Sequence, residues 1–268
     1  MGMMKAIRKA LTIAGSDSGA GAGIQADLKT FAALGVYGTS AITAITAQNT
    51  VGVSAICALS PKLVAAQIDA VVSDIGADAV KTGMLANAAI IETVARKIRQ
   101  HRLRNVVVDP VMVATSGDLL IQKNAVAVLR TRLIPLATVV TPNLPEAEEL
   151  TGMKLRTSVE IDEAARRIVK LGAKAVVIKG GHRKGPAVDL FYDGKKFTAL
   201  NAPRIRTKNT HGTGCTFSAA IAAYLAKGEK IEGAVIFAKR YITQAIKTGF
   251  VVGAGHSPVH HFYRYWKH

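Results

Sequence analysis

Short, continuous runs of Val, Ile and Ala alternate along this chain with longer segments whose apolar residues recur at helical spacing. The apolar runs lie at 10–14, 79–81, 106–108, 138–140 and 175–178, and the amphipathic segments lie at 67–75, 88–98, 125–133 and 161–171. Unbroken apolar runs are typical of strands that helices cover on both sides, whereas half-exposed strands alternate apolar and polar residues. The pattern predicts an α/β protein with three layers, α/β/α, around a mostly parallel central sheet.

The last third of the chain departs from this alternation. Apolar segments at 187–192 and 196–200 flank Asp193-Gly194, a dipeptide that strongly favours a two-stranded hairpin. Two helical patterns follow, at about 213–227 and 231–248. Because no repeat or linker interrupts the 268 residues, we expect one domain over 1–268.

Composition narrows the cellular setting. The basic residues Lys5, Arg8 and Lys9 precede an apolar stretch too short for a signal peptide, and the two cysteines, Cys57 and Cys215, do not have metal-ligand spacing. We therefore expect a cytoplasmic protein without disulfides. Residues 30–61 carry no charge but contain many Thr, Ser and Gly, which favours buried strands over a membrane span. Such strands could also pair across a dimer.

The net charge is +17, from 35 basic and 18 acidic residues. A surplus of this size suits either a nucleic-acid surface or a face that attracts anionic small molecules. The basic residues are spread over helical segments with few aromatic residues between them for base stacking, which favours the second interpretation. A ligand-binding or nucleic-acid-binding protein on the same fold stays the alternative outside catalysis.

A glycine-rich segment, residues 15–23, follows the first predicted strand, where a ligand can approach the backbone closely. A dinucleotide-binding fingerprint starting at Gly19 would need glycine where Ile24 stands, and no acidic residue follows at the spacing of a ribose partner. The chain also contains no Gly-Lys-Ser or Gly-Lys-Thr, so a Walker-type phosphate loop is excluded.

A second glycine-rich segment, 207–218, runs directly into an Ala-rich helical pattern. The backbone N–H groups of such a helix start form an anion site, to which Thr210 and Thr213 add hydroxyl groups and which Gly212 and Gly214 leave open. A helix N-terminus should lower the pKa of the Cys215 thiol and so make a thiolate base plausible, although a first-turn cysteine is more often a small buried residue.

Polar side chains also follow other predicted strands. Asp109 ends the run 106–108, and Asn143 and Glu146 lie one helical turn apart after the run 138–140. Magnesium keeps several waters and takes few protein ligands, so Asn143 and Glu146 are candidate metal ligands, chiefly through water. The equally weighted alternative is a helix cap with an acid in the first turn. Asp109 is a candidate for the same metal or phosphate site.

Together these segments resemble the ribokinase superfamily, and within it the hydroxymethylpyrimidine/phosphomethylpyrimidine kinases of thiamin biosynthesis. The resemblance runs nearly end to end and is carried by residues 14–18, 23–29, 46–50, 81–85, 109–112, 141–143, 179–182, 209–215 and 257–262. It implies Mg- and ATP-dependent phosphorylation of an aminopyrimidine alcohol and of its monophosphate, by a homodimer without nucleic-acid or membrane partners. Ala20 stands where members often carry glycine, which leaves substrate preference less certain.

The resemblance also implies roles for individual residues. Cys215 would be the catalytic base, where the wider superfamily has Asp, and Gly212 and Gly214 would supply anion-hole backbone. Asp27 and Gln48 would hold the pyrimidine, since a carboxamide matches an aminopyrimidine edge. The remaining implied positions are Gly15, Met84 and Val111 in the substrate pocket, and Asp109, Lys179, Thr210, Thr213 and Lys239 on the ATP and phosphate side. Pyridoxal kinase is the close rival, because its substrate is also a hydroxymethyl-bearing heterocycle.

Overall fold

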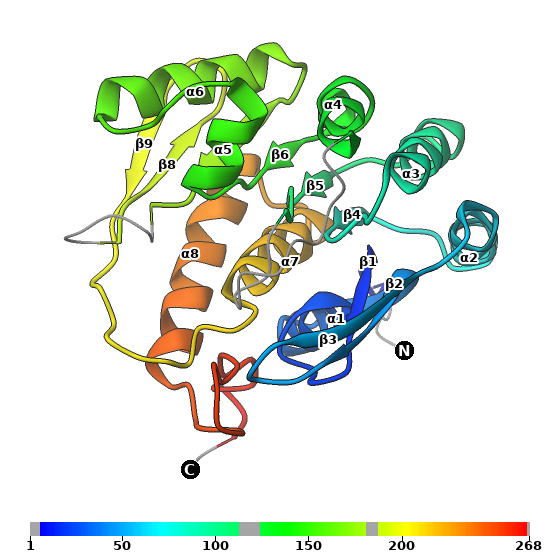
Figure 1. Cartoon of the computed structure of the whole chain (residues 1–268), viewed down its shortest axis with the longest axis horizontal. Coiled ribbons are helices and arrows are strands. Elements are labelled where there is room, and N and C mark those ends of the chain that lie inside the picture. Colours follow the sequence, from blue (N-terminus) through cyan, green and yellow to red (C-terminus); the bar gives the residue numbers. More distant parts are fainter. Residues whose placement is uncertain (1–5, 113–123, 181–186, 267–268) are drawn as a thin grey trace, which may run out of the picture.

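The computed structural model describes residues 6–112, 124–180 and 187–266. Within these ranges nine strands form one sheet in the order β3-β2-β1-β4-β5-β6-β7-β8-β9. The strands are β1 Lys9–Asp17, β2 Tyr37–Gln48, β3 Val53–Ala58, β4 Ala79–Thr82, β5 Val106–Val108, β6 Val139–Val140, β7 Ala175–Ile178, β8 Asp189–Tyr192 and β9 Phe197–Leu200. The six adjacent strands β2, β1, β4, β5, β6 and β7 are parallel to one another, and the pairs β2–β3, β7–β8 and β8–β9 are antiparallel. The mostly parallel sheet is confirmed (Figure 1).

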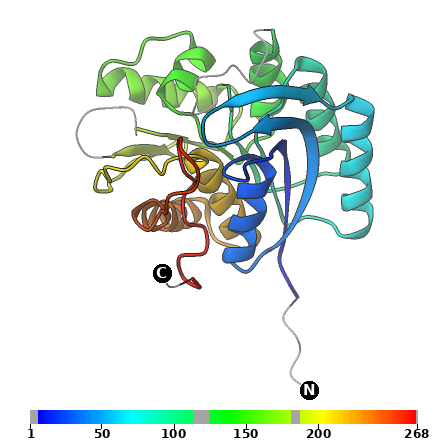
Figure 2. The ribbon, with the colours of Figure 1, turned by 60° about the horizontal axis from the view of Figure 1, so that its bottom comes forward.

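Helices cover both faces of this sheet, as the continuous apolar runs predict. Helices α2 Pro61–Asp74, α3 Ala88–Gln100, α4 Ala125–Val128, α5 Leu144–Thr151 and α6 Ser158–Lys170 pack on one face, and α1 Gly23–Ala33, α7 Thr213–Ala226 and α8 Ile231–Lys247 on the other. Successive side chains of β5 point to opposite faces of the sheet. Val106 and Val108 pack into the hydrophobic core that α2 to α6 cover, and Val107 packs into the core that α1, α7 and α8 cover. Figures 1 and 2 show the resulting three layers.

Two local expectations need correction. The segment 125–133 is not one α-helix, because α4 continues as a π-helical turn over Leu129–Leu133. The uncharged segment 30–61 does contain strands, but β3 is largely exposed, with Ile56 42% accessible. The physical reason is its position at the edge of the sheet, where it has only β2 as a neighbour.

The hairpin forms where Asp193-Gly194 predicts it, with β8 and β9 antiparallel and Gly194 at φ 90°. The segment after α8 returns to the start of α7, where His211 donates its backbone N–H to the Ser257 carbonyl oxygen at 3.1 Å. Among the described residues, no helix has the length and apolarity needed to cross a bilayer.

Candidate active site

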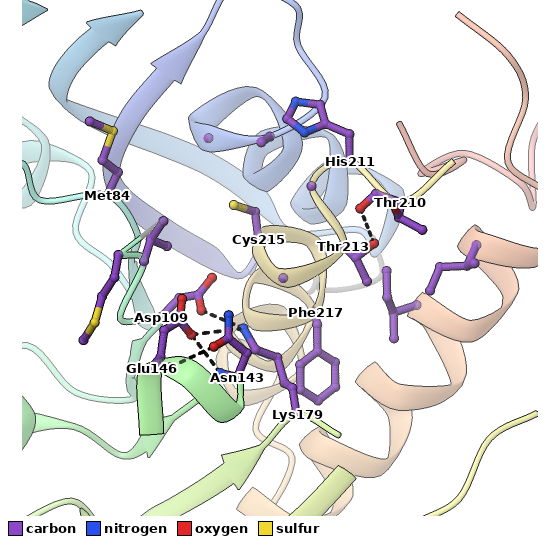
Figure 3. Close-up of a pocket in the computed structure, with 18 of the residues that line it drawn as sticks. Met84, Asp109, Asn143, Glu146, Lys179, Thr210, His211, Thr213, Cys215 and Phe217 are labelled. Atoms are coloured by element: carbon purple, nitrogen blue, oxygen red, sulfur yellow. Dashed lines mark hydrogen bonds and ion pairs between the residues drawn. The ribbon is translucent and has the colours of Figure 1, made fainter. Parts of the chain in front are cut away.

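A cavity of about 1170 Å³ opens at the edge of the sheet where the parallel strands end. Its walls include the ends of β1, β2, β4 and β5, the start of α5, and the loop that leads into α7. Ligands of open α/β sheets bind at this edge because the loops after the strands converge there. Fourteen of the fifteen residues proposed above as site residues line it: Gly15, Gln48, Met84, Asp109, Val111, Asn143, Glu146, Lys179, Thr210, Gly212, Thr213, Gly214, Cys215 and Lys239. Figure 3 labels several of them, among them Asp109, Lys179 and Cys215.

The loop before α7 presents its backbone to this cavity. Gly212 is the N-cap of α7 and has φ 74°, a left-handed conformation that glycine adopts without strain. A Cβ atom on Gly212 would lie 1.8 Å from the Gly21 carbonyl oxygen, and one on Gly214 would lie 3.2 Å from Lys179 Nζ. Thr213 donates its hydroxyl hydrogen to the Thr210 carbonyl oxygen at 2.6 Å, so the Thr213 hydroxyl is already engaged.

Charged side chains gather beside this helix N-terminus. Lys179 Nζ lies 3.1 Å from Asp109 Oδ1 and 4.0 Å from Glu146 Oε2, and the Lys179 side chain is 18% exposed. Burial alone would lower the pKa of Lys179, but the two carboxylates hold it above its ordinary value. Burial raises the pKa of Glu146 to about 7, and Lys179 only partly offsets this. The anion site, a cation and two carboxylates thus meet in one place.

Asn143 and Glu146 form a capping box at the start of α5. Asn143 Oδ1 accepts from the Glu146 N–H at 2.9 Å, and Glu146 Oε2 accepts from the Asn143 N–H at 2.8 Å. The capping interpretation is therefore correct. Asp109 and Glu146 both line the cavity, and such hard oxygen ligands, completed by water, suit magnesium. Within the described ranges no three His, Cys, Asp or Glu side chains gather as a ready-made metal cage.

Cys215 lies in the first turn of α7 and lines the cavity. The expected lowering of its pKa is wrong for the ligand-free protein, because burial raises the pKa of this thiol to about 11. The nearby Lys81 ammonium acts in the opposite direction without compensating. Cys215 is therefore a thiol at neutral pH until a ligand changes its surroundings.

This pKa predicts slow alkylation of Cys215. In a Cys57→Ser variant, we expect the iodoacetamide reaction to accelerate roughly tenfold per pH unit up to about pH 10, because only the thiolate reacts. Mass spectrometry of the modified peptide measures the rate. A rate that levels off below pH 9 would contradict a raised pKa of Cys215. The exposed Cys57 of the wild-type protein provides the reference reaction.

The substrate side of the cavity differs from the sequence prediction at Asp27. Gly15, Gln48, Met84 and Val111 line the wall, and a Cβ on Gly15 would lie 3.0 Å from Met84 Sδ. Asp27 does not line it: the side chain is completely buried and accepts from Lys81 Nζ at 2.8 Å and from Thr12 Oγ1 at 2.6 Å. Direct contact between Asp27 and a pyrimidine does not fit this arrangement, and Lys81 lines the cavity instead.

Lys239 lies on the opposite side of the cavity. The Lys239 side chain is only 12% exposed, although it lies on the last helix, α8. Its Nζ donates to Asp189 Oδ2 at 2.7 Å and to the Ala187 carbonyl oxygen at 3.2 Å. The neighbouring wall is apolar, formed by residues such as Phe217, Ile242 and Ile246. Of the motif 179–182, Gly181 and His182 lie outside the described residues.

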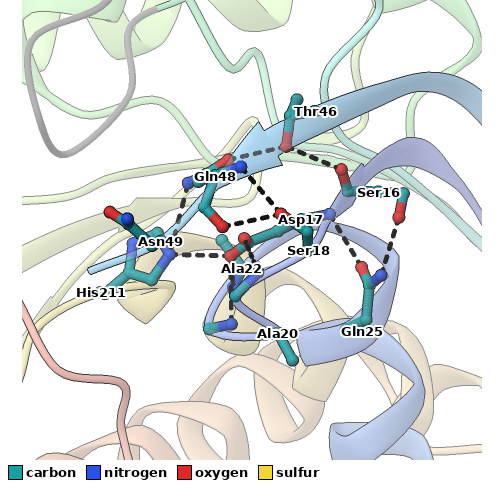
Figure 4. Close-up of polar contacts among 12 residues, drawn as sticks. Ser16, Asp17, Ser18, Ala20, Ala22, Gln25, Thr46, Gln48, Asn49 and His211 are labelled. Carbon is teal, nitrogen blue, oxygen red and sulfur yellow. Dashed lines mark hydrogen bonds and ion pairs between the residues drawn. The ribbon is translucent and has the colours of Figure 1, made fainter. Parts of the chain in front are cut away.

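Three of the cavity residues to which the sequence assigned no role carry polar or charged groups that bear on the site. They are Lys81, Asp17 and His211, all of which line the cavity. Asp17 and His211 belong to the two glycine-rich loops and contact each other (Figure 4). Their positions inside recognised motifs were visible in the sequence, but nothing local indicated that they pair.

Comparison with known proteins agrees with this geometry. The sequence model of the family described as Phosphomethylpyrimidine kinase matches residues 17–260. A hydroxymethylpyrimidine/phosphomethylpyrimidine kinase of Bacillus subtilis (strain 168) is 51% identical over 258 residues, which cover 96% of this chain and 95% of that protein. The thiamine biosynthesis bifunctional protein ThiED of Geobacter sulfurreducens is 57% identical over 252 residues, and this chain spans 51% of its length.

A solved structure is similar over almost its whole length. Bacillus subtilis pyridoxal kinase in complex with ADP matches with a TM-score of 0.89 and 46% sequence identity, covering 96% of this chain and 98% of that one. The relatives therefore divide between two named activities that share one fold.

Proposed function

The chain belongs to the phosphomethylpyrimidine kinase family, and on that premise we propose that it transfers the γ-phosphoryl group of ATP to the hydroxymethyl oxygen of 4-amino-5-hydroxymethyl-2-methylpyrimidine. We propose that it then phosphorylates the monophosphate, so that both steps belong to thiamin biosynthesis. The observation that carries the proposal is the meeting of the α7 N-terminus with Lys179, Asp109 and Glu146 in a cavity whose other wall holds Gln48 and Met84.

Phosphoryl transfer through a loose transition state needs positioning and charge stabilisation more than covalent help from the protein. The backbone N–H groups at Gly212 and Gly214 would bind the transferring group, and the Lys179 ammonium beside Gly214 would offset its charge. The carboxylates of Asp109 and Glu146 would hold Mg²⁺ through water, and the bound ion would neutralise the phosphate oxygens. Apolar residues near Lys239 would receive the nucleotide base.

Cys215 is the group best placed to take the proton of the attacking hydroxyl. Its thiol must first lose its own proton, which the raised pKa opposes and the charge of Lys81 favours. Because a loose transition state needs little help from a base, a weakly activated cysteine is sufficient. On the substrate side, Gln48 would match the amino group and ring nitrogen of the pyrimidine.

The test is Mg-dependent ADP release with three separate acceptors: the pyrimidine alcohol, its monophosphate and pyridoxal. We expect turnover of both pyrimidines, loss of turnover when magnesium is chelated, and at least a tenfold lower rate in a Cys215→Ala variant. Absence of ADP release with all three acceptors would refute the kinase assignment and favour a binding protein instead. Binding to DNA at increasing salt concentration would then test the nucleic-acid alternative.

Pyridoxal is the second candidate acceptor, because the similar Bacillus subtilis structure is named a pyridoxal kinase. The common scaffold and the hydroxymethyl group shared by the two substrates make this exchange chemically simple. Turnover of pyridoxal alone would leave the phosphoryl-transfer site intact and replace only the substrate.

Assembly and location are also proposals. The exposed apolar surface of β3 at the edge of the sheet, with Ile56 and Cys57, supports a homodimer in which this edge is covered. The exposed, unpaired thiol of Cys57 suits the reducing cytoplasm. One kinase domain over residues 1–268 is consistent with the single sheet.

A further inference from the structure

The first glycine-rich loop is organised around the carboxylate of Asp17. Asp17 Oδ1 accepts from the Gly19 N–H at 2.8 Å, and Oδ2 accepts from the N–H groups of Gly21 at 3.0 Å and Ala22 at 2.8 Å. Burial alone would raise the pKa of Asp17, but the hydrogen bonds from His211 and the loop N–H groups hold it below its ordinary value. Asp17 is therefore ionised and acts only as an acceptor.

The second glycine-rich loop contributes His211 to the same carboxylate. His211 Nε2 lies 2.8 Å from Asp17 Oδ2, and the side chains of His211 and Asp17 are 9% and 3% exposed. The ring packs directly on the first loop, since a Cβ on Gly21 would lie 2.1 Å from His211 Cδ2. The pair thus joins the loop after β1 to the residue immediately before Gly212.

The number of hydrogens on His211 Nε2 determines which terminal atom of the Gln48 carboxamide can face the Asp17–His211 pair. Because Asp17 only accepts, Nε2 of His211 must carry the hydrogen, whether the ring is neutral or cationic. Gln48 Nε2 lies 3.4 Å from this same nitrogen, which would bring two donors face to face. The nitrogen and oxygen of a carboxamide have nearly the same shape, so the partners determine which of them faces His211.

The opposite orientation removes this clash between donors. Thr46 Oγ1 lies 2.9 Å from the Ser16 carbonyl oxygen, to which it donates, and 3.1 Å from the second terminal atom of the Gln48 carboxamide. If that second atom is the amide nitrogen, it donates to Thr46, while the Gln48 oxygen lies 3.4 Å from His211 Nε2 and is a second, weaker acceptor of the one hydrogen that this nitrogen donates to Asp17. One amide hydrogen and one oxygen lone pair then remain for a ligand.

We propose that the Asp17–His211 pair is a positioning element that turns the oxygen of the Gln48 carboxamide toward His211, and so sets the donor and acceptor that the pocket offers to its substrate. The remaining N–H and lone pair match a heterocycle that carries an amino group beside a ring nitrogen. Pyridoxal has no such pair of groups, so the same device discriminates against it. This inference rests on the proposed function insofar as Gln48 contacts the substrate.

Three variants separate positioning from general loosening of the loop. His211→Leu removes the donor and keeps an apolar side chain of moderate size, whereas His211→Gln keeps an N–H group that reaches Asp17 and Gln48. Gln25→Leu is the matched control, because Gln25 holds the same loop through the Asp17 N–H at 2.9 Å and Ser16 Oγ at 2.7 Å without contacting Gln48.

The dissociation constant of the pyrimidine alcohol, measured by calorimetry without ATP, should rise about tenfold in His211→Leu, as expected for the loss of one good hydrogen bond. It should stay within about threefold of wild type in His211→Gln and Gln25→Leu. In turnover, His211→Leu should raise KM and leave kcat within about threefold, and its preference for the pyrimidine over pyridoxal should fall. Equal effects in His211→Leu and Gln25→Leu would overturn the inference.

A measurement without substrate tests the orientation of Gln48 independently of the proposed function. Nitrogen NMR of the histidine side chains in the wild-type protein should show the His211 proton on Nε2, and a proton on Nδ1 alone would overturn the orientation of Gln48. If the wild type neither binds nor turns over the pyrimidine, the proposed substrate is wrong, and the NMR result still decides whether the Asp17–His211 pair orients Gln48. It also decides the matter if His211→Leu fails to fold.

Discussion

We expect the Gly212→Ala variant to turn over its substrate about a hundredfold more slowly than the wild type, or slower still. A methyl group at this position would lie 1.8 Å from the Gly21 carbonyl oxygen, and the residue has φ 74°, where alanine is strained. The two glycine-rich loops would have to separate, and the N–H groups that follow Gly212 would move away from the transferring phosphoryl group. Losing one such donor commonly costs a factor of about 10²–10³ in kcat.

The control for this experiment lies at the other end of the same helix. Gly228 follows α7 with φ 90°, but nothing lies within 4 Å of the position that its Cβ would occupy. Gly228→Ala should therefore lower the free energy of unfolding by about 1 kcal/mol through backbone strain alone and leave kcat unchanged. Steady-state kinetics and thermal unfolding of both variants make the comparison. Similar kcat values for Gly212→Ala and Gly228→Ala would remove Gly212 from the anion site.

Much of the fold was predictable because its signals are local. The apolar run 106–108 forms strand β5, and Asp193-Gly194 produces the hairpin between β8 and β9. Sheet order was less accessible, because it depends on contacts between distant segments such as β1 and β4. The exposed face of β3 was missed for a related reason, since composition does not show whether a strand lies at the edge or the centre.

The same distinction between local and long-range signals applies to the residues of the site. The capping box of Asn143 and Glu146 and the glycine-rich helix start at Gly212 are local patterns, and both are present. The pKa of Cys215 is not local, because its burial comes from packing of α7 against other elements and outweighs the effect of the helix N-terminus. The partner of Asp27 was equally hidden, since Lys81 lies 54 residues further along the chain.

The buried ion pair of Asp27 and Lys81 leads to the second large effect, which is on stability. Both side chains are 0% exposed, and Lys81 Nζ lies 2.8 Å from Asp27 Oδ2. Burial alone would lower the pKa of Lys81, but Asp27 holds it above its ordinary value. Removing the cation in Lys81→Met leaves a carboxylate in the core without its counter-charge. We expect the free energy of unfolding at pH 7 to fall by about 3–5 kcal/mol.

The pH dependence of Lys81→Met distinguishes this cause from a simple packing defect. Without Lys81, Asp27 stays buried most easily as the neutral acid, so the folded variant binds a proton that the unfolded chain releases at neutral pH. Above the ordinary pKa of Asp, about 3.9, the variant should therefore lose stability as pH rises, by at most about 1.4 kcal/mol per unit, until the folded carboxyl also ionises. The wild type should show a smaller slope of the same sign, because burial raises the pKa of Asp27 and Lys81 partly offsets this.

Two further variants complete the argument, each compared with wild type by urea unfolding between pH 5 and 8. Lys154→Met removes the cation of an exposed pair, in which Lys154 is 77% exposed and lies 3.5 Å from Glu148, so its effect should stay within about 0.5 kcal/mol at any pH. Asp27→Leu combined with Lys81→Met removes both charges and should recover most of the loss, because an apolar pair leaves no unpaired ion in the core. If the double variant is as unstable as Lys81→Met and shows the same slope, the destabilisation does not come from an uncompensated Asp27, and the pair contributes to the fold through shape alone.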